Sequence, residues 1–202
     1  MKLDYTHNCI ILDASGSMNA IREDVVGSVK NFVQGQKRKK SEDETILLDV
    51  YQFSDETQHI VSSASIDLFD PSNYNCSGCT ALYDAICIAV DELLEKFKGL
   101  KERDRPEDVS LVIVTDGMEN ASRRFQRYDV QTRIEAVKEM GWTVLYLAAN
   151  VDVHKTGRDI GLSDAQDRVS FNTADVKEKL CCMLDYNMER VRESRKMRRK
   201  EK

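Results

Sequence analysis

Apolar positions along the chain follow two patterns that alternate with each other. Short apolar runs occupy residues 8–12, 45–53, 57–62, 109–114, 142–149 and 169–171. Between them, apolar residues recur every three or four positions over residues 21–33, 80–99, 130–140 and 175–198. The first pattern predicts strands and the second predicts amphipathic helices. This alternation indicates a doubly wound α/β fold, in which helices cover both faces of an open, mostly parallel central sheet.

Two of the predicted strands are expected to break the parallel arrangement. Residues 45–53 and 57–62 are separated only by the turn Ser54–Glu56. Because so short a connection cannot cross over a sheet, these strands should form an antiparallel hairpin at the sheet edge. The proline-containing segments 66–75 and 101–108 are expected to be a loop and a charged linker.

Oxygen-bearing side chains follow two of the predicted strands. Asp13, Ser15 and Ser17 come after the first apolar run, and Asp116 comes after run 109–114, the candidate for the sheet centre. Ligands of doubly wound sheets bind beyond the carboxyl ends of strands, where the strand order reverses. Carboxylate and hydroxyl oxygens are ligands that a small divalent cation such as Mg²⁺ takes. Ser15 or Ser17 could instead cap the helix that follows.

These residues belong to three motifs that together resemble the von Willebrand factor A domain with its metal-ion-dependent adhesion site (MIDAS). The motifs are Asp13–Ser17, Gly78–Leu82 and Thr115–Gly117, in that family's order and on its elements. The resemblance covers nearly the whole chain, residues 6 to about 185. It implies a central sheet with one antiparallel edge strand, in agreement with the hairpin.

Two later stretches sharpen the resemblance. Residues 118–123 and 141–152 are similar to small stand-alone A domains of bacteria and their phages. A stand-alone domain of this kind is expected to work through another polypeptide.

The resemblance also implies a complete set of metal ligands. The hydroxyls of Ser15, Ser17 and Thr80 would bind the metal, and the carboxylates of Asp13 and Asp116 would contribute, partly through water. The metal would be Mg²⁺, with Mn²⁺ or Ca²⁺ as substitutes, and a partner protein would present an Asp or Glu to the last coordination position. A cation with few direct carboxylates stays electrophilic, so an incoming carboxylate gains more.

One feature departs from the family pattern. The family usually has small residues before the threonine, whereas Cys76 and Cys79 stand here in a C-x-x-C arrangement. This arrangement could be a redox pair or half of a zinc site, but zinc usually needs a second pair or added histidines. A small-residue loop beside the metal is the favoured interpretation.

Other polar residues near the predicted site have open roles. Asp84 and Glu119 could orient the ligands, and Asp84 could equally be an acid that favours the start of a helix. Asn150 and Asp152 end a strand at the same rim, where a turn is favoured over a partner contact. The histidines, His7, His59 and His154, show no ligand spacing and are expected to be ordinary surface or loop residues.

Composition limits the broad class of the protein. The chain has 202 residues, 41% of them hydrophobic and 32% charged, which suits one globular domain with a real core. No apolar run approaches the length of about 20 residues that a membrane span needs. The chain starts without the pattern of a signal peptide, and its six cysteines show no disulfide framework, so a cytoplasmic location with reduced thiols is expected.

The chain end is strongly basic. Residues 1–188 are expected to form the A domain and residues 189–202 a basic helical extension that frays into solvent. The extension could bind nucleic acid or an acidic membrane, but charge alone is weak support for either. The basic extension also complements the rest of the chain, which is acidic enough to give the whole chain a net charge of −5. This complementarity hints at weak self-association.

Three classes of function remain at this stage. A metal-dependent protein-binding module is favoured. A metal-dependent hydrolase is the least supported, because no histidine, lysine or second carboxylate pair is placed beside the predicted metal. The third is a nucleic-acid-associated protein that acts through the basic extension.

Overall fold

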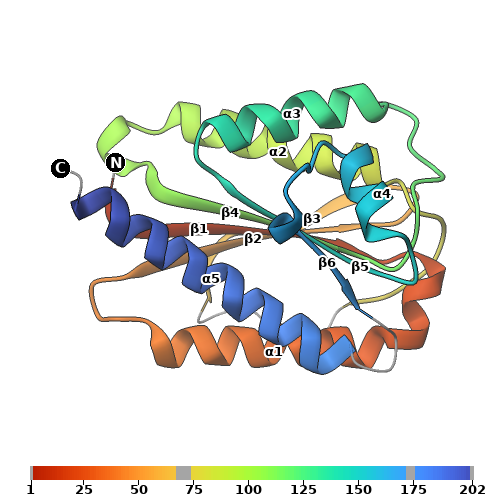
Figure 1. Ribbon diagram of the computed structural model, residues 1–202, viewed down its shortest axis with the longest axis horizontal. Helices are drawn as coiled ribbons and strands as arrows, with labels where there is room; N and C mark the ends of the chain where they lie inside the picture. Colours follow the sequence, from red (N-terminus) through yellow and green to blue (C-terminus); the bar gives the residue numbers. More distant parts are fainter. Residues whose placement is uncertain (1, 67–73, 172–175, 201–202) are drawn as a thin grey trace.

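One sheet of six strands, in the order β3-β2-β1-β4-β5-β6, organises the protein (Figure 1). The computed structural model describes residues 2–66, 74–171 and 176–200. The strands are β1 (Lys2–Asp13), β2 (Thr45–Phe53), β3 (Thr57–Ser65), β4 (Pro106–Thr115), β5 (Thr143–Ala149) and β6 (Arg168–Phe171). All neighbouring strands pair parallel except β2 and β3, which confirms both the fold class and the antiparallel edge hairpin.

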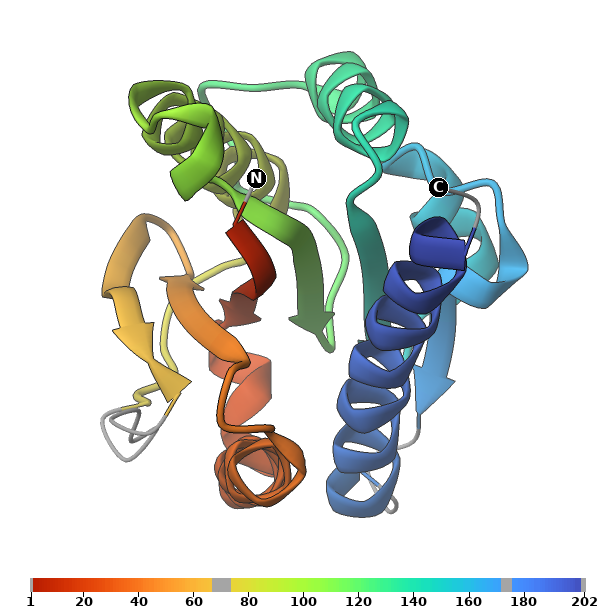
Figure 2. The same ribbon diagram turned by 90° about the vertical axis from the view of Figure 1, so that its left-hand side faces the viewer.

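Helices cover both faces of this sheet, as Figure 2 shows. Helices α2 (Leu82–Gly99) and α3 (Arg127–Glu139) lie on one face, while α1 (Arg22–Lys39) and α5 (Val176–Lys200) lie on the other. The short helix α4 (Val153–Asp159) follows β5, and a 3₁₀ turn, Gly16–Ile21, leads from β1 into α1. Among the described residues, no helix has the length and apolar character that crossing a membrane requires.

The central strand β1 contributes to both hydrophobic cores. Cys9 and Ile11 pack with the helices α2 and α3, whereas Ile10 and Leu12 pack with α1 and α5. Because successive side chains of a strand point to opposite faces, an unbroken apolar run is what such a strand requires. Burial of β1 therefore places its last residue, Asp13, at the middle of the sheet's carboxyl rim.

Two strands begin earlier than the apolar pattern predicts. β1 starts at Lys2 and β4 at Pro106, inside the segment expected to be a linker. A proline is tolerated at the first residue of a strand because it lacks only a donor that the strand can spare there. Within the expected loop 66–75, residues 67–73 lie outside the described residues, and Tyr74 is buried.

The basic end of the chain is docked on the domain, so the expectation of a frayed, solvated end is wrong. Helix α5 continues to Lys200, across the expected boundary at residue 188. Arg195 is buried, and its guanidinium donates to the Asp108 carboxylate at 2.6 Å and to the Thr6 hydroxyl at 2.5 Å. Neighbouring arginines extend this arrangement through the pairs Arg190–Asp167, Arg192–Glu44, Arg198–Asp108 and Arg199–Glu107. The complement of the basic end is thus the acidic amino-terminal end of the sheet of the same chain.

A buried ionic cluster on the α2 face corrects the expectation for the histidines. His7 is fully buried in β1, and its ring donates to the Asp49 carboxylate. Asp49 also accepts from His59 and from Lys96, each at 2.6 Å. His154, by contrast, is exposed at the start of α4, as expected. Although burial alone would raise the pKa of Asp49, the hydrogen bonds and charges of His7 and Lys96 hold it well below its usual range.

We expect Asp49→Asn to lower the free energy of unfolding at pH 7 by about 3 kcal/mol, because it removes the anion from a buried cluster. The folded-state pKa of Asp49 is lowered, so its contribution is present above its unfolded pKa of about 4 and is lost as the pH falls below it. The deficit of the variant should therefore shrink toward pH 3. Urea unfolding of both proteins at pH 7, 5 and 3 measures this.

The matched control is Asp91→Asn. Asp91 pairs with Arg133 at 2.8 Å on the surface, with its side chain 47% exposed, so its loss should cost about 1 kcal/mol or less. Equal losses in the two variants would contradict the role given to Asp49.

Candidate metal centre

The two predicted carboxylates lie side by side at the carboxyl rim of the sheet. Asp13 is the last residue of β1, and Asp116 directly follows β4, its parallel neighbour. The chain order reverses between these two strands, since β2 lies beyond β1 on one side and β5 beyond β4 on the other. The carboxylates therefore occupy the switch point where such sheets bind ligands.

Backbone hydrogen bonds join the loops that carry the other predicted ligands. The Gly16 N–H donates to the Gly78 carbonyl at 3.0 Å, and the Ser77 N–H donates to the Ala14 carbonyl at 2.7 Å. These bonds hold the Asp13–Ser17 turn against the segment that leads to Thr80. Gly78 has a φ of +79°, and a Cβ built there would lie 2.1 Å from Oδ2 of Asp55. The close approach of these loops therefore requires a glycine at this position.

The hydroxyl and carboxylate oxygens converge at the rim. The hydroxyl oxygens of Ser15 and Ser17 are 3.2 Å apart, and the Ser17 hydroxyl donates to Oδ1 of Asp116 at 2.6 Å. Thr80 approaches from the α2 side, with its Oγ1 3.3 Å from where a Cβ on Gly117 would lie. Asp13, Ser15, Thr80 and Asp116 are buried, while Ser17 is exposed at the mouth. The structure thus gathers Asp13, Ser15, Ser17 and Asp116 directly, and Thr80 lies against the same loop.

The site carries unbalanced negative charge. Burial raises the pKa of Asp13 above its usual range, against hydrogen bonds from Thr115 and Ser15 that lower it, and the negative charge of Asp116 adds to the rise. Among the described residues, no lysine, arginine or histidine forms an ion pair with either carboxylate. Buried charges are normally paired or bound to metal. The donor set of two carboxylates and three hydroxyls therefore fits a hard cation such as Mg²⁺.

A metal at this rim would need hydroxyl ligands. Within the part of the chain that the structure describes, no cluster of three or more His, Cys, Asp or Glu side chains is suited to hold a metal. Serine and threonine oxygens would therefore have to supply part of any coordination shell here.

Three residues that support the site had no role assigned from the sequence. The Thr115 hydroxyl donates to Oδ2 of Asp13 at 2.5 Å, and the Ser15 N–H donates to Oδ1 at 2.7 Å, so both carboxylate oxygens are held. The Tyr74 hydroxyl donates to the Asp13 carbonyl. Asn120 accepts from the Thr80 N–H at 2.8 Å and donates its own N–H to the Thr80 carbonyl at 3.0 Å. Thr115 belongs to the third sequence motif and Asn120 to the stretch 118–123 that resembles stand-alone A domains, whereas nothing local in the sequence marks Tyr74.

Asp84 and Glu119 shape the loop that follows β4. Asp84 accepts from the N–H groups of Arg123 and Phe125, each at 2.9 Å. Glu119 accepts from the Ser122 N–H at 2.7 Å and, across the loop, from the Tyr83 N–H at 2.9 Å at the start of α2. These two acids therefore anchor the loop carrying Asp116 to the helix that follows Thr80, which is a positioning role.

The remaining candidates near the rim have structural roles. All six cysteines are free, with Cys76 partly buried and Cys79 exposed. Burial raises the pKa of Cys76, which keeps its thiol protonated. Asn150 adopts a left-handed φ of 57°, and Asp152 caps α4 by accepting from the N–H groups of His154 and Lys155. The turn expected at residues 150–152 is confirmed.

A sequence model of the von Willebrand factor type A domain matches residues 9–181. No curated protein matches the chain.

Solved structures share the fold at low identity. The vWF domain of the type V pili tip protein Mfa5 from Porphyromonas gingivalis has a TM-score of 0.69 at 9% identity, over 92% of this chain and 96% of that one. Manganese-loaded TRAP protein from Plasmodium vivax has a TM-score of 0.60 at 12% identity, over 90% and 75% of the two chains. Proximal thread matrix protein 1 from the mussel byssus, with a zinc-occupied MIDAS motif, has a TM-score of 0.59 at 16% identity, over 89% and 45%.

We expect Gly78→Ala to disturb the site from its supporting loop. The added Cβ meets the Asp55 carboxylate and the backbone has a positive φ, so the variant should lose about 1–3 kcal/mol of stability and bind Mg²⁺ more weakly. Gly99→Ala is the control, because a Cβ there has no neighbour within 4 Å. Urea unfolding and calorimetry measure both effects. Wild-type behaviour of Gly78→Ala would show that the loop does not constrain the site.

Proposed function

The chain belongs to the von Willebrand factor type A domain family, and from this premise we propose that it is a metal-dependent protein-binding module. In this proposal Asp13, Ser15, Ser17, Thr80 and Asp116 hold Mg²⁺, and a partner protein presents an Asp or Glu to the metal. Proteins of this family are commonly metal-dependent adhesion or protein-binding modules, and the zinc- and manganese-bound structures are members that hold divalent cations.

The observation that carries this proposal is the pair of buried carboxylates without a cationic neighbour. Asp13 and Asp116 are 0% and 8% exposed and lie at the switch point of the sheet. A bound cation would offset their repulsion, and the adjoining hydroxyls would complete its oxygen shell.

The arrangement also favours capture of a carboxylate over catalysis. Both oxygens of Asp13 already accept hydrogen bonds from Ser15 and Thr115, so this acid is held as a fixed charge. Ser17, at the exposed mouth, donates its hydroxyl hydrogen to Asp116, so its oxygen lone pairs remain for a cation. Among the described residues, no histidine or lysine hydrogen-bonds to these groups as a base would, so we propose no enzymatic activity.

The packing of α5 argues against the alternative function, binding of nucleic acid through the basic chain end. The arginines of residues 190–199 that would face phosphates are engaged with acidic groups of the same chain, Arg195 most deeply. Binding to nucleic acid would have to break these pairs. We also propose a cytoplasmic location, which suits the free thiols of all six cysteines.

Calorimetric titration should show saturable binding of Mg²⁺ and Mn²⁺ to the wild-type protein. The double variant Asp13→Ala with Ser15→Ala, and separately the near-isosteric Asp116→Asn, should weaken binding by more than about 100-fold, since even supporting residues of a metal site contribute 10- to 100-fold. Mg²⁺ at 100 times its Kd should also raise the free energy of unfolding by about 2.7 kcal/mol.

Asp152→Asn is the matched control for this titration. It removes one negative charge from the same rim, and asparagine caps a helix about as well as aspartate does. It should bind Mg²⁺ as the wild type does. Equal loss in Asp152→Asn and Asp116→Asn would mean that the rim attracts cations without a specific site.

Partner capture separates the protein-binding and nucleic-acid functions. Polypeptides retained by the immobilised chain in Mg²⁺ should be released by EDTA and absent with Asp116→Asn. Nucleic-acid binding would instead survive both treatments and fall steeply between 50 mM and 200 mM salt. Salt-sensitive retention of nucleic acid by Asp116→Asn, without EDTA-sensitive protein, would favour the alternative.

A further inference from the structure

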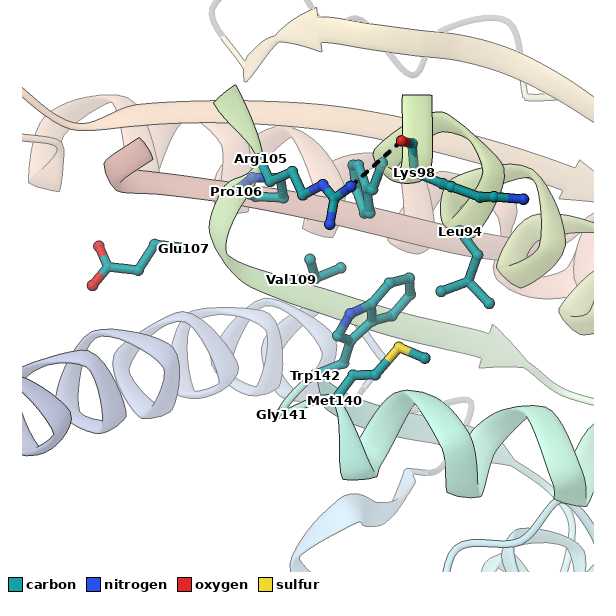
Figure 3. Close-up of a pocket in the computed structure, with 10 residues that line it drawn as sticks. Leu94, Lys98, Arg105, Pro106, Glu107, Val109, Met140, Gly141 and Trp142 are labelled. Carbon is teal, nitrogen blue, oxygen red and sulfur yellow. Dashed lines mark hydrogen bonds between the residues drawn. The ribbon is translucent and has the colours of Figure 1, made fainter. Parts of the chain in front are cut away.

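A pocket with a volume of about 320 Å³ opens at the amino end of the sheet (Figure 3). It lies between the end of α2, the start of β4 and the turn that leads from α3 into β5. Because β4 starts beside this pocket and ends beside Asp116, the pocket and the candidate metal centre lie at opposite ends of the sheet. Small-molecule sites have volumes of about 300–1,000 Å³ and are mostly apolar, with a few polar groups that fix the ligand. The size of the pocket suits a small ligand of this kind.

Apolar side chains from several elements form the walls of the pocket. Phe97 of α2 and Val109 of β4 are buried, Leu94 and Trp142 are half-buried, and Met140 is 61% exposed at the edge. The rings of Phe97 and Trp142 meet edge to face, with their centroids 5.9 Å apart. An apolar cavity of about 150 Å³ already holds a benzene ring. The pocket therefore has room for an apolar body of one or two rings.

The Arg105 guanidinium at this pocket has no anionic partner among the described residues. It is half-buried and donates to the Leu100 carbonyl at 3.2 Å and to the Lys98 carbonyl at 3.4 Å. These neutral carbonyls use two of its five N–H donors and leave its charge unbalanced. In Figure 3 the guanidinium points toward the centre of the pocket. Arg105 therefore offers a cation and spare N–H donors to a ligand.

Neighbouring arginines at the same end of the sheet are paired with acids. Arg195 pairs with Asp108 and Arg199 pairs with Glu107, each at 2.6 Å. Glu107 also lines the pocket, but its carboxylate points away from the pocket in Figure 3 and is held by Arg199. The acid closest to Arg105 along this strand is thus engaged elsewhere. An anion that balances Arg105 would have to come from outside the described part of the chain.

We propose that this pocket binds a small molecule that joins an apolar body to one carboxylate. The body packs against Leu94 and Trp142, and the carboxylate accepts two parallel N–H bonds from the guanidinium fork of Arg105. The other cation of the lining, Lys98, pairs with Glu95 at 3.6 Å on the surface, where both side chains are 77% exposed. A single guanidinium therefore sets the charge at the pocket and matches a monoanion. This binding site is independent of the proposed function.

The first test compares three probes that share a ring and a spacer. They are 3-phenylpropionate, an anion, 3-phenylpropanamide, which is neutral, and 3-phenylpropylamine, a cation. Trp142 is the single tryptophan of the chain and lines the pocket, so its fluorescence and its indole ¹H–¹⁵N signal report binding there. The acid should bind about five- to tenfold tighter than the amide, because charge-assisted hydrogen bonds are the stronger ones, and the amine should bind most weakly. Equal affinities of acid and amide, or no indole response up to about 10 mM acid, would overturn the proposal.

The second test assigns the preference to the guanidinium. Arg105→Gln should lower the affinity of the acid to that of the amide, and continued binding of the amide would show that the pocket is still formed. Arg105→Lys keeps the charge but loses the fork, so it should keep only part of the preference. Should Arg105→Gln fail to fold, Arg105→Lys decides, since a preference as large as that of the wild type would contradict the role of the fork.

Arg103→Gln is the matched control for these variants. Arg103 lies outside the pocket lining, and its side chain is 78% exposed and pairs with Asp104 at 3.9 Å. This variant should bind all three probes as the wild type does. An equal loss of the preference for the acid in Arg103→Gln and Arg105→Gln would mean that general surface charge attracts the anion, and it would overturn the proposed site.

Discussion

The buried carboxylate of Asp13 is the constraint on which the rest of the structure depends. It lies at the end of the central strand, and its two oxygens accept from Ser15 and Thr115 while no cation of the described residues pairs with it. Hydrogen bonds alone make this burial tolerable. The Thr115 hydroxyl also links the rims of β1 and β4, so the position of Asp116 follows from the same contact. The candidate metal centre is therefore part of the junction between β1 and β4 rather than a site carried by loops alone.

The loops around this carboxylate are joined to one another by hydrogen bonds. The Ser15–Ser17 turn is tied to Gly78, the Thr80 segment to Asn120, and the loop after β4 to α2 through Glu119. Each of these hydrogen bonds joins segments far apart in the sequence, so the candidate ligands would already be positioned when a cation binds. Such preorganisation lowers the cost of binding. It also explains why acids such as Asp84 and Glu119 lie close to the site without being suited to contact the metal.

The apolar pattern was sufficient to predict the succession of strands and helices along the chain and the antiparallel edge hairpin. The signal is strong in β1 and β4 because these strands are buried on both faces of the sheet. The convergence of Asp13, Ser15, Ser17 and Asp116 at one rim was predictable because these residues follow those strands in motifs, and their binding of a metal stays a prediction. Features that depend on distant partners were not predictable. His7 looks like any polar residue until Asp49 is brought beside it, and the arginines of α5 look solvated until Asp108 and Glu107 meet them. Tyr74 reaches Asp13 across a segment that carries no periodic pattern.

The distribution of charge distinguishes the two ends of the sheet. At the amino end, Asp4, Glu107 and Asp108 are neutralised by arginines of α5, and within the domain Asp49 is neutralised by Lys96. At the carboxyl end, Asp13 and Asp116 have no such partner among the described residues, although the chain supplies 30 lysines and arginines in all. Most other buried acids pair with cations, and buried Asp84 accepts several backbone N–H groups instead. Asp13 and Asp116 therefore concentrate unpaired negative charge at one point of the rim. In the function proposed for this chain, a divalent cation would offset that charge, and since few charged ligands would surround it, the cation would keep the capacity to attract a carboxylate from outside.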